Sequence, residues 1–164
     1  MMNRKQCLEF LHTQLKDEIV VATYSSASEW VEISNRALDY YSFGAMGLAS
    51  SHALGLALAH PNRRVVVLDG DGSLLMNLGT LVTIAGVGPN NLTHFVGENG
   101  CYEANGEHPL PGRDKVSFAG FARSAGYKTV MEFDDIETLR RELPNFLNAP
   151  GPRFATLRIK PGTE

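Results

Sequence analysis

The sequence has 164 residues, of which 43% are hydrophobic and 20% are charged, and its formal net charge is −3. This length suits a single domain over residues 1–164, and without a basic stripe nucleic acid is not expected as a partner. No apolar run approaches the ~20 residues of a membrane helix, and the N-terminus has no signal-peptide pattern, so we expect a cytoplasmic protein with no membrane partner.

Strand and helix patterns alternate along the whole chain. Apolar residues spaced by three or four positions indicate helices, and short continuous apolar runs indicate buried strands. The predicted helix over 44–60 is small and apolar almost throughout, so we expect it to be buried on most sides. In chain order we predict a helix over 3–16, a strand over 18–23, a polar turn over 24–26, a helix over 27–36, a strand over 39–42, a helix over 44–60, a strand over 64–68, a helix over 73–87, a strand over 92–96, a polar loop over 99–113, a helix over 116–126, a strand over 128–131, a helix over 134–147 and a strand over 154–159.

This alternation predicts an α/β fold, a three-layer doubly wound sandwich with a mainly parallel sheet. In such folds ligands bind at the carboxyl ends of the strands. The loops expected to carry a site are therefore those at 23–28, 43–47, 69–73 and 97–106.

The segment Gly70-Asp71-Gly72-Ser73 follows a buried strand and begins a helix. Its glycines allow a ligand to approach the backbone, and the helix start offers N–H groups to an anion such as phosphate. A dinucleotide-binding fingerprint would carry a third glycine where Leu75 stands. The carboxylate of Asp71 would repel a diphosphate unless a divalent cation lay between them. The segment therefore predicts a metal and a diphosphate together.

A second metal ligand should come from the end of a neighbouring strand. The strand over 92–96 leads into Glu98 and Asn99, 28 positions after Asp71. Carboxylate, amide and carbonyl oxygens form a ligand set that suits Mg²⁺ or Ca²⁺.

Gly70-Asp71-Gly72, followed by 26 residues and then Asn99, resembles the signature of the thiamine-diphosphate enzymes. The segments 43–51 and 20–26 are similar to parts of that family which hold the aminopyrimidine and the diphosphate. The chain is most similar, over roughly residues 5–160, to the pyrophosphate-binding (C-terminal TPP) domain of sulfopyruvate and phosphonopyruvate decarboxylases. The resemblance implies the thiamine-diphosphate-binding fold.

The resemblance also implies roles for individual residues. Asp71, the amide oxygen of Asn99 and the backbone carbonyl of Cys101 would hold Mg²⁺. The Gly44 carbonyl would accept from the exocyclic amino group of the cofactor, and Met46 would force the cofactor to bend. Glu103 and Asn105 are the tentative catalytic residues, on a loop with His108 that would face the substrate. The individual roles of Glu98 and His108 are left open. The residues implied to contact the cofactor are Ser25, Ser26, Gly44, Ala45, Met46, Gly70, Asp71, Gly72, Ser73, Asn99, Cys101, Tyr102, Glu103 and Ala104.

In this superfamily, the glutamate that activates the cofactor belongs to a different, pyrimidine-binding domain. The resemblance therefore implies an oligomer in which this chain is one subunit of a split decarboxylase for a small anionic 2-oxo acid. The glutamate would come from a separate, alpha-type subunit, without which this chain would be inactive. The alternatives are an equivalent subunit of a carboligase or oxidoreductase, a non-catalytic cofactor-binding or scaffold module, and a nucleotide-binding flavodoxin-like domain.

Several other polar residues have an ordinary structural interpretation. Glu29 is interpreted as a solvated residue on a helix. Cys7 and Cys101 lie far apart without metal-binding spacing, so we interpret them as reduced thiols. The histidines interpreted as packed or surface residues are His12, His52, His60 and His94.

Overall fold

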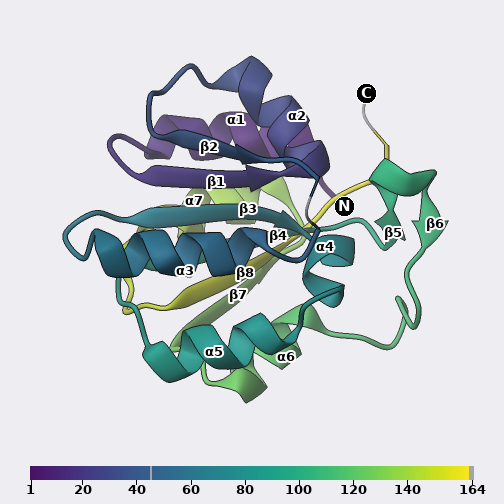
Figure 1. The fold of residues 1–164 in the computed structure, drawn as a ribbon. Helices are drawn as coiled ribbons and strands as arrows, with labels where there is room; N and C mark the ends of the chain where they lie inside the picture. Colours follow the sequence, from purple (N-terminus) through teal and green to yellow (C-terminus); the bar gives the residue numbers. More distant parts are fainter. Residues whose placement is uncertain (45, 163–164) are drawn as a thin grey trace.

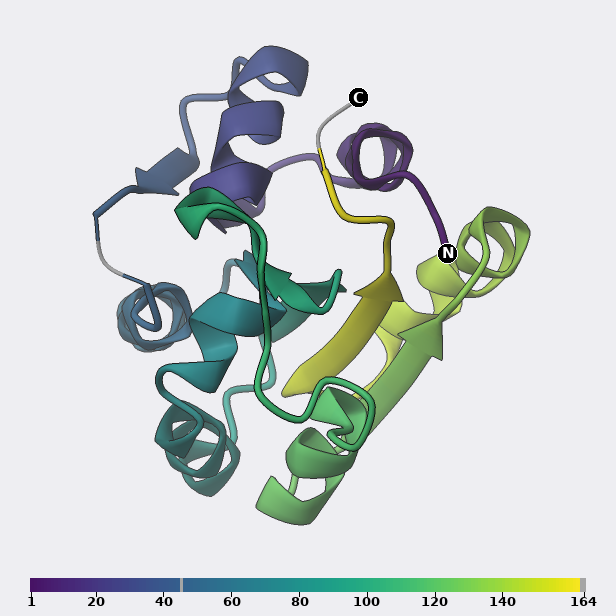
Figure 2. The same ribbon diagram turned by 90° about the vertical axis from the view of Figure 1, so that its right-hand side faces the viewer.

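The computed structural model describes residues 1–44 and 46–162 and contains a six-stranded sheet between two layers of helices (Figures 1 and 2). Every neighbouring pair of strands in this sheet runs parallel, which confirms the predicted α/β class. The strands, in spatial order, are β2 (Asp39–Ser42), β1 (Ile19–Thr23), β3 (Val65–Gly70), β4 (Leu92–Glu98), β8 (Arg153–Arg158) and β7 (Thr129–Phe133).

Three helices cover each face of the sheet (Figure 1). One face carries α1 (Arg4–Gln14), α2 (Tyr24–Ile33) and α7 (Ile136–Asn148). The other face carries α3 (Ala49–Ala59), α5 (Gly79–Val87) and α6 (Phe118–Ala125), and the short helix α4 (Asp71–Leu75) follows β3 directly.

Side chains of the central strands enter the two cores alternately, as the pleat of a strand requires. On β3, Val66 and Leu68 pack with α1, α2 and α7, whereas Val65 and Val67 pack with α3 and α5. This two-sided burial explains why the strand is an unbroken apolar run.

The carboxyl ends of the strands face the viewer in Figure 2, and the segment after β4 crosses above them. This segment was predicted as a polar loop over 99–113. It contains a small antiparallel pair, β5 (Cys101–Tyr102) with β6 (His108–Pro109), joined by the 3₁₀ turn η1 (Glu103–Asn105).

Three expectations about the helices are wrong. The predicted polar turn over 24–26 is the first turn of α2, which begins directly after β1. The predicted helix over 73–87 is two helices, α4 and α5. At the break, the side-chain amide of Asn77 donates to the Gly47 carbonyl at 2.9 Å, and Gly79, a poor helix former, begins α5.

The third wrong expectation concerns the helix predicted over 44–60. The helix α3 begins at Ala49, after a segment in which Gly44 and Gly47 have φ values of 89° and 84°. Such left-handed backbone interrupts a helix. The helix also buries one face only, because Leu58 on it and Leu48 at its start are exposed. None of the helices in the described part of the chain is long and apolar enough to cross a bilayer.

Candidate functional site

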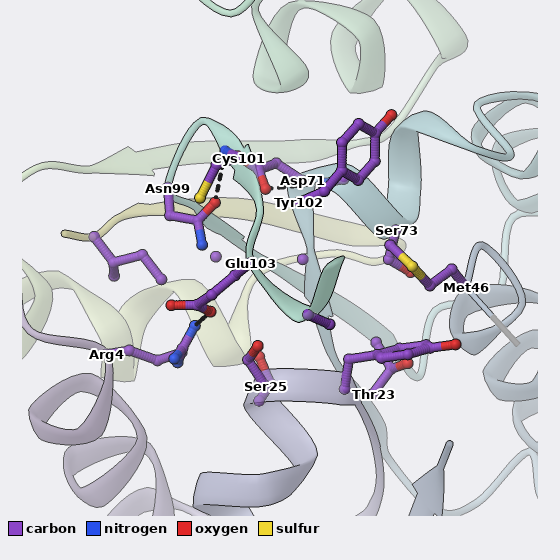
Figure 3. Close-up of a pocket in the computed structure, with 17 residues that line it drawn as sticks. Arg4, Thr23, Ser25, Met46, Asp71, Ser73, Asn99, Cys101, Tyr102 and Glu103 are labelled. Atoms are coloured by element: carbon purple, nitrogen blue, oxygen red, sulfur yellow. Dashed lines mark hydrogen bonds and ion pairs between the residues drawn. The ribbon is translucent and has the colours of Figure 1, made fainter. Parts of the chain in front are cut away.

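The ends of β1, β3 and β4 and the start of β5 surround a small pocket (Figure 3). The pocket encloses about 40 Å³. Most of the residues predicted to contact a cofactor line it, namely Ser25, Ser26, Met46, Gly70, Asp71, Gly72, Ser73, Asn99, Cys101, Tyr102, Glu103 and Ala104. Gly44 and Asn105 do not line it, and Asn105 is exposed on η1. Ala45 lies outside the described residues.

Asp71 is buried and held by two hydrogen bonds. Its side chain is 1% exposed, and its two carboxylate oxygens accept hydrogen bonds from the backbone N–H groups of Gly72 (2.8 Å) and Gly100 (2.7 Å). Burial, with a smaller contribution from the charge of Glu98, raises the pKa of Asp71 to about 6. A bound divalent cation would stabilise this buried carboxylate, so the environment of Asp71 fits a metal site.

Asn99 lies beside Asp71 because the turn after β4 folds back over the end of β3. Its side-chain oxygen accepts from the Cys101 N–H at 3.0 Å, and Gly100 between them has a φ of 76°. The structure thus brings together the carboxylate, the amide oxygen and the backbone predicted to bind Mg²⁺. Carboxylate, amide and carbonyl oxygens are ligands that suit Mg²⁺. In residues 1–44 and 46–162, no three or more His, Cys, Asp or Glu side chains cluster as metal ligands.

Gly72 permits a close approach that no other residue would. A Cβ atom at this position would lie 2.6 Å from Cδ1 of Tyr102. The tyrosine ring therefore packs directly against the first turn of α4 and closes one wall of the pocket. Ser73, one residue later, accepts a hydrogen bond from the Gly47 N–H at 3.0 Å and so holds the segment that carries Met46.

A buried ion-pair cluster borders the pocket, and sequence reasoning missed it. Arg4 is 6% exposed, and its guanidinium lies 2.5 Å from Glu103 and 2.8 Å from Glu29 (Figure 3 shows the Glu103 contact). The solvated role expected for Glu29 is therefore wrong. No local pattern could have revealed the cluster, because Arg4 is separated from its partners by 25 and 99 positions.

Both carboxylate oxygens of Glu103 accept hydrogen bonds within this cluster. Its second oxygen accepts from the Gly162 N–H at 2.7 Å. Burial by itself would raise the pKa of Glu103, but hydrogen bonds from Arg4 and Ser25 outweigh burial and bring the pKa below its ordinary value. Glu103 is thus an ionised carboxylate that ties α1 to the pocket wall.

The histidines have the environments of packing or surface residues. His94 is fully buried, with its Nε2 3.2 Å from a carboxylate oxygen of Asp69, which suits a structural role. His108 is exposed on β6 and does not line the pocket.

Comparison with known proteins gives consistent matches. Residues 21–156 match the family model for the thiamine pyrophosphate enzyme, C-terminal TPP binding domain. The chain is 39% identical to the sulfopyruvate decarboxylase subunit beta of Methanothermobacter thermautotrophicus, over 99% of this chain and 84% of that protein. It is 37% identical to the phosphonopyruvate decarboxylase of Streptomyces viridochromogenes, over 98% of this chain but 40% of that protein.

A solved structure has a similar fold. The thiamine diphosphate-dependent 4-hydroxybenzoylformate decarboxylase of Rhodococcus jostii RHA1 superposes with a TM-score of 0.79 over 99% of this chain. The two sequences are 22% identical, and this chain spans 33% of the larger one. At this identity the likeness shows the architecture alone.

Proposed function

Because the chain belongs to the thiamine pyrophosphate enzymes, through their C-terminal TPP-binding domain, we propose that it is the diphosphate- and Mg²⁺-binding subunit of a split 2-oxo acid decarboxylase. The substrate would be a small anionic 2-oxo acid of the sulfopyruvate or phosphonopyruvate type. The buried carboxylate of Asp71, held by Gly100 beside Asn99, is the observation that carries the proposal.

In this proposal each side of the pocket has a distinct task. Asp71, Asn99 and the backbone carbonyl of Cys101 hold Mg²⁺, while Ser25, Gly72 and Ser73 face the diphosphate. The segment with Gly44 and Met46 orients the rest of the cofactor. When bound, thiamine diphosphate supplies the electron sink that decarboxylation of a 2-oxo acid requires.

The size of the pocket supports a shared site. Its volume of about 40 Å³ is far below the roughly 300 Å³ at which pockets that enclose a whole ligand begin. This chain would therefore grip one end of the cofactor, and a second chain would cover the other end. We expect that alpha-type chain to bind the pyrimidine and to supply the activating glutamate.

Exposed apolar side chains near the pocket support a partner. Phe43, Leu48 and Met76 are between 42% and 59% exposed, and they belong to the segments around Met46 and after α4. Large exposed apolar side chains that gather in one region mark interaction surfaces. We propose that residues 1–164 form one domain of an oligomer.

The cellular compartment is a separate proposal. The free thiols of Cys7 and Cys101 support a reducing compartment such as the cytoplasm.

The test is calorimetric titration of thiamine diphosphate and Mg²⁺ into this chain, alone and mixed with the candidate partner subunit. Asp71→Ala is the test variant. Asp17→Ala is the control, because Asp17 is exposed before β1, at the amino ends of the strands and away from the pocket. We expect binding to tighten with the partner, to vanish in Asp71→Ala and to persist in Asp17→Ala.

The same mixture should release CO₂ from sulfopyruvate or phosphonopyruvate. Absence of cofactor binding both to this chain alone and to its mixture with the partner subunit would overturn the proposal. Cofactor binding without turnover of any 2-oxo acid would instead assign the chain to a carboligase, an oxidoreductase or a non-catalytic module.

A further inference from the structure

A second pocket lies at the amino ends of β3, β4 and β8, at the end of the sheet opposite to the first pocket. Its volume is about 530 Å³. The side chains that line it include the three arginines Arg63, Arg64 and Arg153 and four asparagines, and no acidic residue is among the lining residues described. Nothing in the proposed decarboxylase chemistry uses this pocket.

Arg153 forms part of the inner wall and is 3% exposed. Its Nε donates to the hydroxyl of Thr93 at 2.8 Å and its Nη1 donates to the Ala149 carbonyl at 2.5 Å. Within the described residues, its buried Nη2 has no hydrogen-bond partner. The hydrogen bonds of the guanidinium thus go to neutral acceptors, and its Nη2 is left unpaired.

Such a buried cation is costly without a countercharge. Arg4, the other buried arginine of the described chain, lies against two glutamates. By contrast, burial and the nearby positive charge of Arg64 lower the pKa of Arg153. An anion in the pocket would supply to Arg153 the countercharge that Arg4 receives from protein side chains.

The rim of the pocket adds positive charge, and hydrogen bonds hold the turn that carries it. Arg63 is exposed, and none of the ion pairs found in the described chain includes it. Arg64 pairs with Glu18, which does not line the pocket. The side-chain amide of Asn91 donates to the carbonyls of Ala57, His60 and Arg63 at 2.8–3.1 Å and so fixes the turn that carries the arginines.

We propose that this pocket binds a small molecule through a phosphate or sulfonate group, with Arg153 at the base and Arg63 at the rim. Guanidinium groups match the oxygens of such anions in geometry as well as charge. The pocket and the cofactor site lie at opposite ends of β3, about 20 Å apart for a six-residue strand. Both sites can therefore be occupied at the same time.

The experiment is an NMR titration of the ¹⁵N-labelled full chain with inorganic phosphate, and separately with methanesulfonate, at constant ionic strength. We expect saturable chemical-shift changes of the Asn91 and Gly151 amide resonances, with a Kd below about 10 mM. The amide resonances of Gly72 and Gly100, at the cofactor site, should not show these changes. Gly151 reports on the pocket because its N–H donates to Asn90, a lining residue.

Two variants and a control locate the anion. Arg153→Gln should weaken binding at least tenfold and Arg63→Gln about fivefold, consistent with loss of one charge-assisted contact. Arg123→Gln, which removes an exposed arginine paired with Glu132, should bind as the wild type does. If Arg153→Gln fails to fold, the exposed Arg63 still tests the site.

Three results would overturn the proposal. These are the absence of saturable shifts with both anions, shifts confined to Gly72 and Gly100, and an affinity unchanged in the Arg63 and Arg153 variants. Saturable binding of either anion that both variants weaken supports it, and the relative affinity distinguishes phosphate from sulfonate ligands.

Discussion

The carboxylate of Asp71, at the end of β3, accepts a hydrogen bond of 2.7 Å from the backbone N–H of Gly100, in the turn after β4. The two residues are 29 positions apart in the chain. Parallel neighbouring strands bring them together, because β3 and β4 pair in register up to Gly70 and Gly97. The turn that holds Asn99 is thereby fixed to the first residue of α4.

Asp71→Asn should separate the charge of this residue from its shape. Asparagine keeps one oxygen for the backbone N–H groups but lacks the negative charge that attracts Mg²⁺. We expect Mg²⁺-dependent affinity for thiamine diphosphate, measured by calorimetry with the partner present, to fall at least about 100-fold, or about 2.7 kcal/mol. The melting temperature should change by only a few degrees, and an unchanged affinity would argue against Asp71 as a metal ligand.

Gly72→Ala should destabilise the fold through one contact. The new methyl group would meet the Tyr102 ring at 2.6 Å, and overpacking of this kind costs about 1–3 kcal/mol. In a Tyr102→Ala background the same substitution should cost much less, so a double-mutant cycle by urea unfolding would report strong coupling. Gly70→Ala is the control, because a Cβ atom added there would meet nothing within 4 Å beyond its own chain neighbours. Additive effects of the first two substitutions would contradict this account.

Arg4→Gln should change how stability depends on pH. The pKa of Glu103 is lowered in the folded state, so its ionised form contributes stability above the unfolded pKa of about 4.3 and loses it as pH falls through the lower folded value. Because Arg4→Gln removes the cation from both Glu29 and Glu103, it should reduce the free energy of unfolding by about 3 kcal/mol at pH 7. The difference in free energy of unfolding between Arg4→Gln and the wild type should become smaller below about pH 4.

The matched control for this prediction is Arg140→Gln, which removes an exposed arginine paired with Glu137. Exposed pairs contribute about 0.5 kcal/mol or less, so this variant should follow the wild type at every pH. Urea unfolding between pH 3 and pH 7 provides the measurement. A loss of stability in Arg4→Gln that is equal at pH 3 and pH 7 would show that the charges of Glu29 and Glu103 are not involved.

Cys7 should resist alkylation while the protein is folded. Burial, together with the charge of Glu29, raises the pKa of this thiol to about 12. At pH 8 the reactive thiolate is then on the order of a thousandfold scarcer than for a free cysteine. Iodoacetamide followed by peptide mass spectrometry should find Cys7 unmodified in the native protein and modified in urea. Rapid labelling of the native protein would place Cys7 outside the core.

Strands were more predictable than helices, for a physical reason. A strand buried on both faces leaves an unbroken apolar run, and the predicted strand over 18–23 agrees within one residue with β1, whose five residues are all buried. The break between α4 and α5 was missed although Asn77 and Gly79 are weak helix formers. The contact of Asn77 with Gly47 at this break spans 30 positions and has no local pattern. The same holds for the site. Asp71 and Asn99 follow strands and could be found from their spacing, whereas Arg4 joins Glu103 only through the tertiary fold.

The first and last described segments of the chain run side by side. Met2 forms a bridge with Ile159, and its carbonyl accepts from the Lys160 N–H at 2.9 Å. Circular permutation should therefore succeed if these ends are joined by a short linker and the chain is opened within the exposed residues 111–115. For the same reason, a complementary domain attached at either end would begin near Gly162 and Glu103, beside the pocket. A second domain would thus start beside the pocket whether it belonged to the same polypeptide or to a separate one.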